Sequence, residues 1–340
     1  MTATTTVRPN DPDPGEAVPR PFTGSLTTSD QVFRTVARGS GWLVMILTGS
    51  IALFLGLKLV PTLRHYGLSY FTETQFNPER NVVGIGSAIV GSVVVALIAL
   101  VIAFPIALLT ALYISEYAPI RLKAFLTSLV DLMAAVPSII YGVWGVAFLM
   151  PHLIFVSRWL SEYLGWIPIF DVHGADPSAA TFAQFRFEQS AFDAGIVVAL
   201  MVIPLACAVM RNVFAQAPLG EREGAYALGS TKWGMIRSVV LPYGRGGIIG
   251  GMMLGLGRAL GETVAVLLIL SLEFGVKVRV LESGGVTISK LIAERFESAT
   301  STQLAALLAA GFVLFVMTLL VNTVAAVIVS RSRSGAGVDL

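Results

Sequence analysis

An arginine and a glutamate lie inside an otherwise apolar, glycine-rich stretch, residues 255–266. A charge at the centre of a bilayer costs at least ~2.5–3.5 kcal/mol, so this stretch predicts a functional site. On one continuous helix, Arg258 and Glu262 would be four residues apart and would share a face. A guanidinium can hold an oxyanion through two parallel hydrogen bonds. The pair therefore indicates either a path for an anion or an ion pair that only locks two helices together.

A second polar patch lies in another apolar stretch, where Pro137 is followed by Ser138 and Tyr141. A proline inside a helix leaves a backbone carbonyl without its partner, and the two hydroxyls add further polar groups. At ~1.5 Å per residue, Pro137 and Arg258 each lie ~18–20 Å from the start of their predicted helices, at the same depth. We therefore predict that Ser138 and Tyr141 face Arg258 across a central path. The alternative is a proline kink whose hydroxyls bond to their own backbone.

The elements that must position these residues are membrane-spanning helices. Of the 340 residues, 55% are hydrophobic and 13% are charged, and the mean hydropathy is +0.78, far more apolar than a soluble protein. A helix that crosses the ~30 Å hydrocarbon layer needs about 20 mostly apolar residues. Six segments qualify and predict an all-α integral membrane protein: 41–63, 84–113, 124–150, 194–210, 246–272 and 304–329.

Basic residues beside the predicted helices set the orientation of the chain. The short second connection carries Arg121 and Lys123, and the C-terminal tail carries Arg331 and Arg333. Both termini are therefore predicted to be cytoplasmic, and the polar residues up to Thr27 are predicted to be disordered. The predicted organisation is a cytoplasmic tail (1–40), a first spanning helix (41–63), a core (84–329) that includes an outer segment (151–193) and a cytoplasmic loop (211–245), and a cytoplasmic tail (330–340).

The cytoplasmic loop is typical of a helical hairpin. Gly229 can adopt the positive φ that closes a first helix, and Ser230 or Thr231 can cap a second. Pro242 is predicted to end that second helix where the chain re-enters the bilayer. The hairpin would form a rigid projection for a soluble partner to bind, although its spacing alone also allows a hairpin with no partner.

The same loop resembles the EAA loop of ABC importer permeases, a pattern of Glu-Ala-Ala, three residues, Gly, nine residues, Ile, any residue and Leu-Pro. The spacing matches in full, with Gly224 and Val239 in place of Ala and Ile. The resemblance implies that the loop docks on a cytoplasmic ATPase. Its matching positions are Glu223, Ala225, Gly229, Leu241 and Pro242.

The chain itself has no phosphate-binding loop for ATP, because no lysine follows a glycine. We therefore expect ATP and its Mg²⁺ to bind on a partner ATPase, and this chain to hold no cofactor and to be no enzyme. The net charge of +2 is too small to predict a nucleic-acid binder. The single cysteine, Cys207, lies in an apolar run and cannot build a disulfide framework, and no metal site is expected.

Two stretches resemble the phosphate permeases of the Pst system, of the PstC type: Pro-Ser-Ile-Ile-Tyr-Gly from Pro137 and Gly-Arg-Ala-Leu-Gly-Glu-Thr from Gly257. The resemblance covers about 84–329. It implies a type I ABC importer permease of a bacterial plasma membrane, with phosphate as substrate. It also implies three partners besides membrane lipid: a PstA-like permease, a PstB-like ATPase dimer and a PstS-like external binding protein. Arg258 and Glu262 match charged positions that the family implicates in transport.

Two other functions stay open. A sulfate or molybdate permease would share the architecture, although such permeases tend to have Phe-Gly after the glutamate, where Thr263 and Val264 stand here. An ion-coupled secondary carrier would use Glu262 or Asp131 as its proton site and would need no ATPase. We favour a simpler role for Asp131, as a partner of a basic residue or of a hydrogen-bond donor within the bundle.

Overall fold

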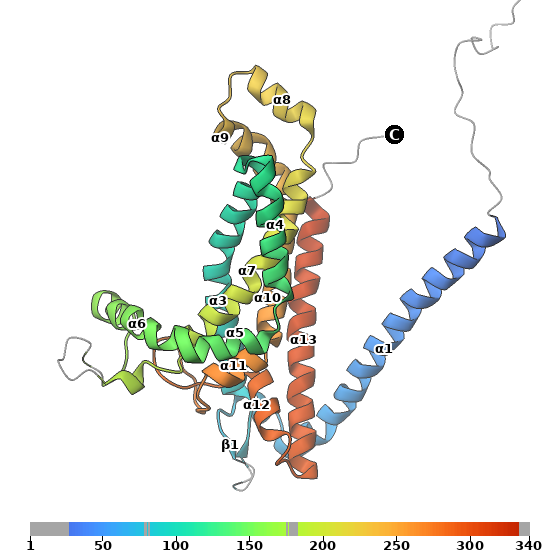
Figure 1. Ribbon diagram of the computed structural model, residues 1–340. Helices are drawn as coiled ribbons and strands as arrows, with labels where there is room; N and C mark the ends of the chain where they lie inside the picture. The colour runs from blue at the N-terminus through green and yellow to red at the C-terminus, as the bar shows by residue number, and fades with distance from the viewer. Residues whose placement is uncertain (1–26, 78–79, 81, 175, 177–182, 333–340) are drawn as a thin grey trace, which may run out of the picture. The chain divides into compact units, whose positions relative to one another are not determined.

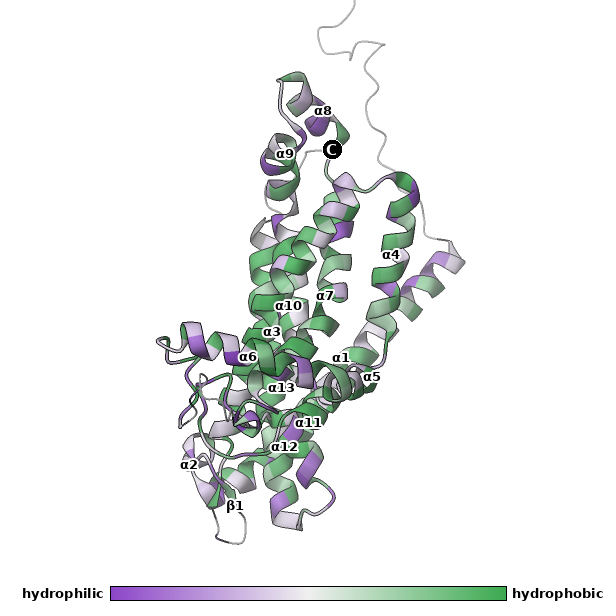
Figure 2. Cartoon of the chain, turned by 60° about the vertical axis from the view of Figure 1, so that its left-hand side comes forward, coloured by the Kyte–Doolittle hydropathy of each residue, from purple (hydrophilic) through white to green (hydrophobic). Residues whose placement is uncertain are grey.

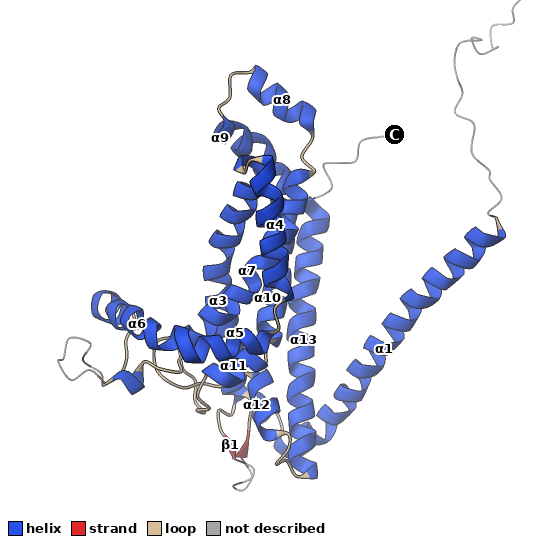
Figure 3. Cartoon of the chain, in the orientation of Figure 1, coloured by secondary structure: helices blue, strands red, loops and turns tan. Residues whose placement is uncertain are grey.

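A computed structural model of the chain describes residues 27–77, 80, 82–174, 176 and 183–332. The predicted disorder of the first residues and the end of the predicted C-terminal tail lie outside this described part. The chain divides into two compact units, 1–51 and 52–340. In the described part, the structure is helical apart from loops and one short sheet, as Figure 3 shows.

Six described helices are long and apolar enough to cross a membrane, in agreement with the predicted number. Their bounds differ from the predicted ones at several helices. At the first, α1 (Thr28–Tyr66) extends beyond 41–63 at both ends. Within the first unit, α1 is exposed along 28–51 and is apolar over 41–51, which suits a lipid-facing helix there. The six segments are Thr28–Tyr66, Gly86–Tyr117, Ser138–Leu164, Ala191–Ala215, Lys232–Gly261 and Ser301–Ser330.

The third spanning helix was predicted to be continuous over 124–150, and this is wrong. Helix α4 (Ile120–Ala135) ends where Val136 becomes extended, and α5 (Ser138–Trp144) starts after Pro137. A π-helical turn (Gly145–Leu149) then leads into α6 (Met150–Leu164), and α5 and α6 run across the bundle while α4 runs along it (Figure 1). The proline provides the reason, because it has no N–H to donate and disfavours helical backbone in the residue before it.

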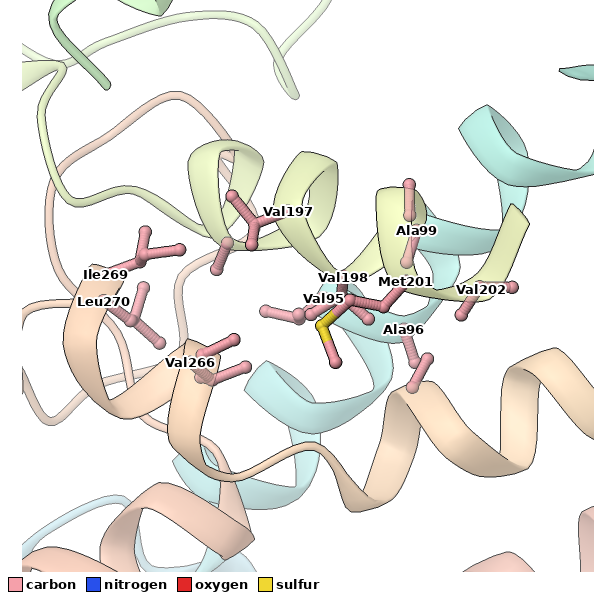
Figure 4. Packing of buried hydrophobic residues seen from close by; sticks show 14 of the residues in the cluster. Val95, Ala96, Ala99, Val197, Val198, Met201, Val202, Val266, Ile269 and Leu270 are labelled. Atoms are coloured by element: carbon pink, nitrogen blue, oxygen red, sulfur yellow. The ribbon is translucent and has the colours of Figure 1, made fainter. Parts of the chain in front are cut away.

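The core of the larger unit is the contact between α3 (Gly86–Leu112) and α7 (Ala191–Ala215). A stripe of small side chains on α3, at Ala96, Ala99, Ala103 and Ala107, is buried. Such residues let two helix backbones approach closely inside a membrane, where packing drives association. Figure 4 shows the valines and the methionine of α7 meeting this stripe, together with Val266, Ile269 and Leu270.

The two ends of this bundle differ. One end carries α8 (Leu219–Ala227) and α9 (Lys232–Met235), whose surfaces are the hydrophilic regions at the top of Figure 2. The opposite end carries α2 (Ser69–Thr72), the antiparallel strands β1 (Phe76–Asn77) and β2 (Val82–Val83), and α12 (Ile288–Arg295) (Figure 1). Phe76 pairs with Val83 and Asn77 with Val82. The buried Tyr70 hydroxyl joins α2 to α13 (Ser301–Ser332) by donating to the Ala306 carbonyl at 2.7 Å.

The segment predicted as the outer one, 151–193, is partly helical. It contains most of α6 and a 3₁₀ turn (Gln184–Arg186). An ion pair between Asp171 and Arg279, at 3.3 Å, joins it to the loop between α11 (Val264–Ile269) and α12. The described residues of this segment therefore pack on the rest of the larger unit.

Candidate translocation path and coupling loop

The helix that carries Arg258 stops before it reaches Glu262. Helix α10 (Leu241–Gly261) ends at Gly261, Glu262 is extended with φ −67° and ψ 125°, and α11 begins at Val264. The sequence prediction of one continuous helix over 246–272 is therefore wrong. Two hydrogen bonds account for the break: the Glu262 side chain accepts from the Ala265 N–H at 3.3 Å, and the Ser289 hydroxyl donates to the Glu262 carbonyl at 2.7 Å. Backbone groups that leave the helical ladder are thus satisfied by other partners.

Because the helix breaks, Arg258 and Glu262 do not form the predicted pair. The ion pairs among the described residues do not join them, and the two side chains differ in environment. Glu262 is 9% exposed, whereas Arg258 is exposed on the surface of this chain. Arg258 is therefore available to another charged species, and Glu262 acts as a cap of α11.

The second break, between α4 and α5, contains the predicted hydroxyls. Pro137 cannot donate to the Met133 carbonyl, and the Tyr141 hydroxyl donates to that carbonyl at 3.0 Å instead. For Tyr141, this agrees with the alternative of a proline kink whose hydroxyls bond to nearby backbone. Ser138, the first residue of α5, is half-buried one turn before Tyr141.

The two breaks lie side by side. Helix α5 packs against α11 so closely that a Cβ on Gly142 would lie 2.8 Å from Leu268 Cδ1 and 3.1 Å from Ala265 Cα. Tyr141 of α5 packs against the buried cluster that contains Ala259, Leu260 and Ala265. Because Arg258 directly precedes Ala259 and Glu262 lies between Leu260 and Ala265, the two breaks place Tyr141 in the same region as both charged residues.

Asp131 pairs with a basic residue, as predicted. Its carboxylate lies 3.4 Å from a guanidinium nitrogen of Arg211 at the end of α7. The Asp131 side chain is 53% exposed and that of Arg211 is 12% exposed. The pair joins α4 to α7, and it gives Asp131 a bundle contact rather than a place in the junction.

The loop 211–245 forms the predicted hairpin. Helix α8 ends in a Schellman motif, in which the Ser230 N–H donates to the Ala225 carbonyl at 3.1 Å and the Gly229 N–H donates to the Tyr226 carbonyl at 2.9 Å. Gly229 has φ +82°, as the motif requires. The Thr231 hydroxyl accepts from the Gly234 N–H at 3.1 Å and caps α9.

Pro242 does not end the second helix of this hairpin, contrary to the prediction. The chain stays helical from Lys232 to Gly261, and a π-helical turn (Ile236–Val240) precedes Pro242 in the first turn of α10. A wider turn is a common way to absorb a proline within a helix. Leu241 is half-buried and Pro242 is exposed at this point.

The outer surface of the hairpin combines charge with apolar side chains. Glu223 is exposed, and so are Tyr226, Leu228 and Trp233, with Leu228 at 89%. Ala225 is partly buried and packs against the cluster that includes Met235, Ile236 and Val240. Exposed apolar side chains at the tip of a hydrophilic projection are typical of a protein interface.

The part of the chain that holds both breaks and the hairpin also matches a known family. Residues 103–334 match the binding-protein-dependent transport system inner membrane components. The chain belongs to this family. The EAA-like spacing and the two motifs at Pro137 and Gly257 predicted an importer permease of this family, and the prediction is confirmed.

Curated relatives of this family member align over nearly their whole length. The "Phosphate transport system permease protein PstC 2" of Mycobacterium tuberculosis is 39% identical over 310 residues, 90% of this chain and 93% of the relative. The protein named PstC of Mycobacterium leprae is 39% identical over 322 residues, 93% and 97% of the two chains. That of Xylella fastidiosa (strain Temecula1) is 38% identical over 304 residues, 89% and 91%.

Solved structures of importers share the fold of this family member. The chain matches a structure of the MetNI methionine ABC transporter with a TM-score of 0.53 and 14% identity, covering 76% of this chain and 99% of the other. It matches a bacterial ABC transporter involved in alginate import with a TM-score of 0.56 and 19% identity, covering 88% and 99%. The predicted fold class, an all-helical type I importer permease, is confirmed.

Several charged residues with little exposed side-chain area, in the described part of this family member, were not singled out from the sequence. Glu116 and Arg222 form an ion pair at 3.0 Å, at the base of the hairpin. Lys290 of α12 is 3% exposed, donates to the Leu267 carbonyl at 3.3 Å and pairs with Glu294 at 3.2 Å. None of these pairings except Lys290–Glu294, at i and i+4, has a local sequence signal.

Proposed function

We propose that this chain is the permease subunit of an ATP-driven importer of inorganic phosphate. The observation that carries the proposal is the alignment, over about nine-tenths of both chains, with relatives named phosphate transport system permease proteins. The coupling hairpin and the exposed arginine between two broken helices support it. Such a subunit needs a surface on which the ATPase docks and a polar group that meets the anion inside the membrane.

Arg258 is the proposed partner of the anion during passage. Its guanidinium is exposed at the junction of α10, α11 and α5, where broken helices provide polar backbone groups inside an apolar bundle. A fixed positive charge there offsets part of the cost of dehydrating phosphate. Tyr141 and Ser138 lie on the neighbouring wall, and Glu262 holds the break in place. Binding at this point must be weak enough for release, so selectivity belongs to an external receptor.

The proposed partners follow from the surfaces of the chain. A PstB-like ATPase dimer, which carries ATP and Mg²⁺, would dock on Glu223, Leu228 and Trp233. A PstA-like permease would cover the exposed apolar faces of α4 and α5, and a PstS-like binding protein would deliver phosphate at the opposite end of the bundle. This arrangement puts both termini in the cytoplasm. In a Cys207→Ala background, an impermeant thiol reagent added outside should label Val278→Cys and leave Leu228→Cys unlabelled; the reverse pattern contradicts the orientation.

Uptake of labelled phosphate tests the proposal. Cells without their own high-affinity phosphate importer would express this chain with its ATPase, second permease and binding protein. We expect saturable uptake that needs the ATPase and that a large excess of sulfate or molybdate does not inhibit. Inhibition by those oxyanions would favour the sulfate or molybdate alternative. Uptake without the ATPase that a protonophore abolishes would favour a secondary carrier.

A further inference from the structure

Helix α8 of the coupling hairpin has little hydrophobic attachment to the rest of the chain. None of its residues is buried, and only Arg222 and Ala225 are partly covered. The hairpin continues covalently into α7 on one side and α10 on the other. Within α8, any further link to the membrane bundle must therefore run through these two inward-facing positions, of which Arg222 is the charged one.

The Arg222 guanidinium donates three hydrogen bonds. Nη1 donates to Glu116 Oε2 at 3.0 Å, Nη2 donates to the Phe214 carbonyl at 2.6 Å, and Nε donates to the Ala217 carbonyl at 3.2 Å. Phe214 lies in the last turn of α7, where a cation is favoured by the helix dipole and by the unpaired carbonyls. A planar fork of donors suits this site, and a lysine could not reproduce it.

Glu116 belongs to a different helix. It lies in the π-helical turn Tyr113–Tyr117 that extends α3, and its side chain is 4% exposed against 16% for Arg222. The Lys232 ammonium lies over the ring of the next residue, Tyr117, 4.8 Å from the ring centroid. Helix α9 therefore contacts the same turn. Both helices of the hairpin therefore meet the end of α3, which has no covalent connection to the hairpin.

A buried ion pair is a stiff connection because separating its partners leaves two uncompensated charges with little water. Its location matters more here than its contribution to stability. Helix α3 packs along α7 through its alanine stripe, and Lys123 at the start of α4 donates to the Ser115 carbonyl at 3.3 Å. A displacement of the hairpin that passes to Glu116 therefore reaches α3 and, through the alanine stripe, α7. The Lys123 bond lies beside this route and does not join α3 to the hairpin.

We propose that the Arg222–Glu116 ion pair is the joint that transmits movement of the coupling hairpin to α3. The inference rests on the proposed function, since it takes the hairpin as the docking point of an ATPase. Arg222 and Glu116 are positioning residues: neither touches phosphate nor ATP. Without the joint, the hairpin can move with the ATPase while α3 stays behind, so ATP is hydrolysed without transport.

The test measures phosphate imported per ATP hydrolysed. The complete complex, with its second permease, ATPase and phosphate-loaded binding protein, is reconstituted in proteoliposomes. We expect Glu116→Gln and Arg222→Lys each to lower this ratio about tenfold, the loss typical of one charge-assisted hydrogen bond. The ATPase should co-purify in normal amount. The double variant Glu116→Gln/Arg222→Gln should be no worse than Arg222→Gln alone, because both changes remove the same interaction.

Lys123→Met is the matched control, since it removes a cation that bonds to the same end of α3 but not to the hairpin; its ratio should stay within about twofold of wild type. If Glu116→Gln and Arg222→Lys import as much phosphate per ATP hydrolysed as wild type, the proposed joint is wrong. It is also wrong if these variants lose co-purified ATPase in proportion to their loss of transport. Should Glu116→Gln not assemble, Glu116→Asp keeps the charge and shortens the reach, and its ratio decides in the same way. A wild-type complex that imports no phosphate would instead contradict the proposed function.

Discussion

Two helix ends in this permease are stabilised by different kinds of contact. Helix α8 ends within its own hairpin: the carbonyls of Ala225 and Tyr226 are satisfied by the next residues, and Gly229 supplies the positive φ. Helix α10 ends at Gly261 with the help of Ser289, 27 residues after the carbonyl that it holds. The first end is therefore rigid by itself, whereas the second depends on how α12 is placed. A rigid coupling element and a break that responds to its neighbours are what a transport cycle requires.

The largest effect is expected at the membrane break, from Arg258→Gln. Glutamine keeps hydrogen-bond donors but loses the charge that meets the anion. A hydrogen bond to a charged group contributes about 1.5–3 kcal/mol, so uptake should fall by about ten- to a hundredfold. Arg258→Lys keeps the charge but loses the planar guanidinium, so its uptake should lie between that of wild type and that of Arg258→Gln. Labelled-phosphate uptake at matched membrane levels is the measurement, and wild-type rates in Arg258→Gln would remove Arg258 from the path.

The coupling hairpin is tested by Gly229→Val. The left-handed backbone costs an ordinary residue ~1–2 kcal/mol and a β-branched one more, so the hairpin should open and transport should fall about tenfold. No atom lies within 4 Å of a Cβ built on Gly229, so the effect comes from the backbone alone. Gly229→Asn tolerates the same φ and should retain most of the activity. Equal losses in the two variants would show that side-chain space, and not φ, controls this position.

A smaller effect is expected where the two breaks touch. Gly142→Ala places a methyl group 3.1 Å from the Ala265 backbone, which cannot yield as a flexible side chain can. Overpacking of this kind costs about 1–3 kcal/mol and should lower the melting temperature of the solubilised complex. Gly261→Ala is the control, since nothing lies within 4 Å of its Cβ. If both variants have the melting temperature of wild type, α5 and α11 are less tightly packed than the Gly142 contacts indicate.

The smallest effect is expected from Ser289→Ala. One neutral hydrogen bond to the Glu262 carbonyl contributes about 1 kcal/mol, so uptake should fall no more than about fivefold. Ser298→Ala removes an exposed hydroxyl that bonds only to the Arg295 carbonyl of its own segment, and should match wild type. A loss in Ser298→Ala as large as in Ser289→Ala would weaken the claim that α12 holds the break.

The same contrast explains what could be predicted from the sequence. The hairpin depends on neighbours in the chain, so the positive φ of Gly229 and the cap at Thr231 were both predicted. The break after Gly261 was not predicted, because the contact that ends the helix comes from the distant Ser289. Gly261 follows Gly255 and Gly257 in the same stretch, so it does not by itself single out the break. Pro137 did signal a kink, but a proline does not determine the direction of the helix that follows. The Glu116–Arg222 pair, 106 residues apart, has no local pattern at all.

The central claim is that Arg258 acts on the anion and not as one half of a clamp with Glu262. The most direct test compares labelled-phosphate uptake in Arg258→Gln with uptake in Arg258→Gln/Glu262→Gln. Glutamine at 262 keeps an oxygen that can accept from the Ala265 N–H, so the break should persist. We predict that the double variant stays as inactive as the single one. Substantial recovery of uptake in the double variant would contradict the account, because it would show that the loss came from an unpaired buried carboxylate.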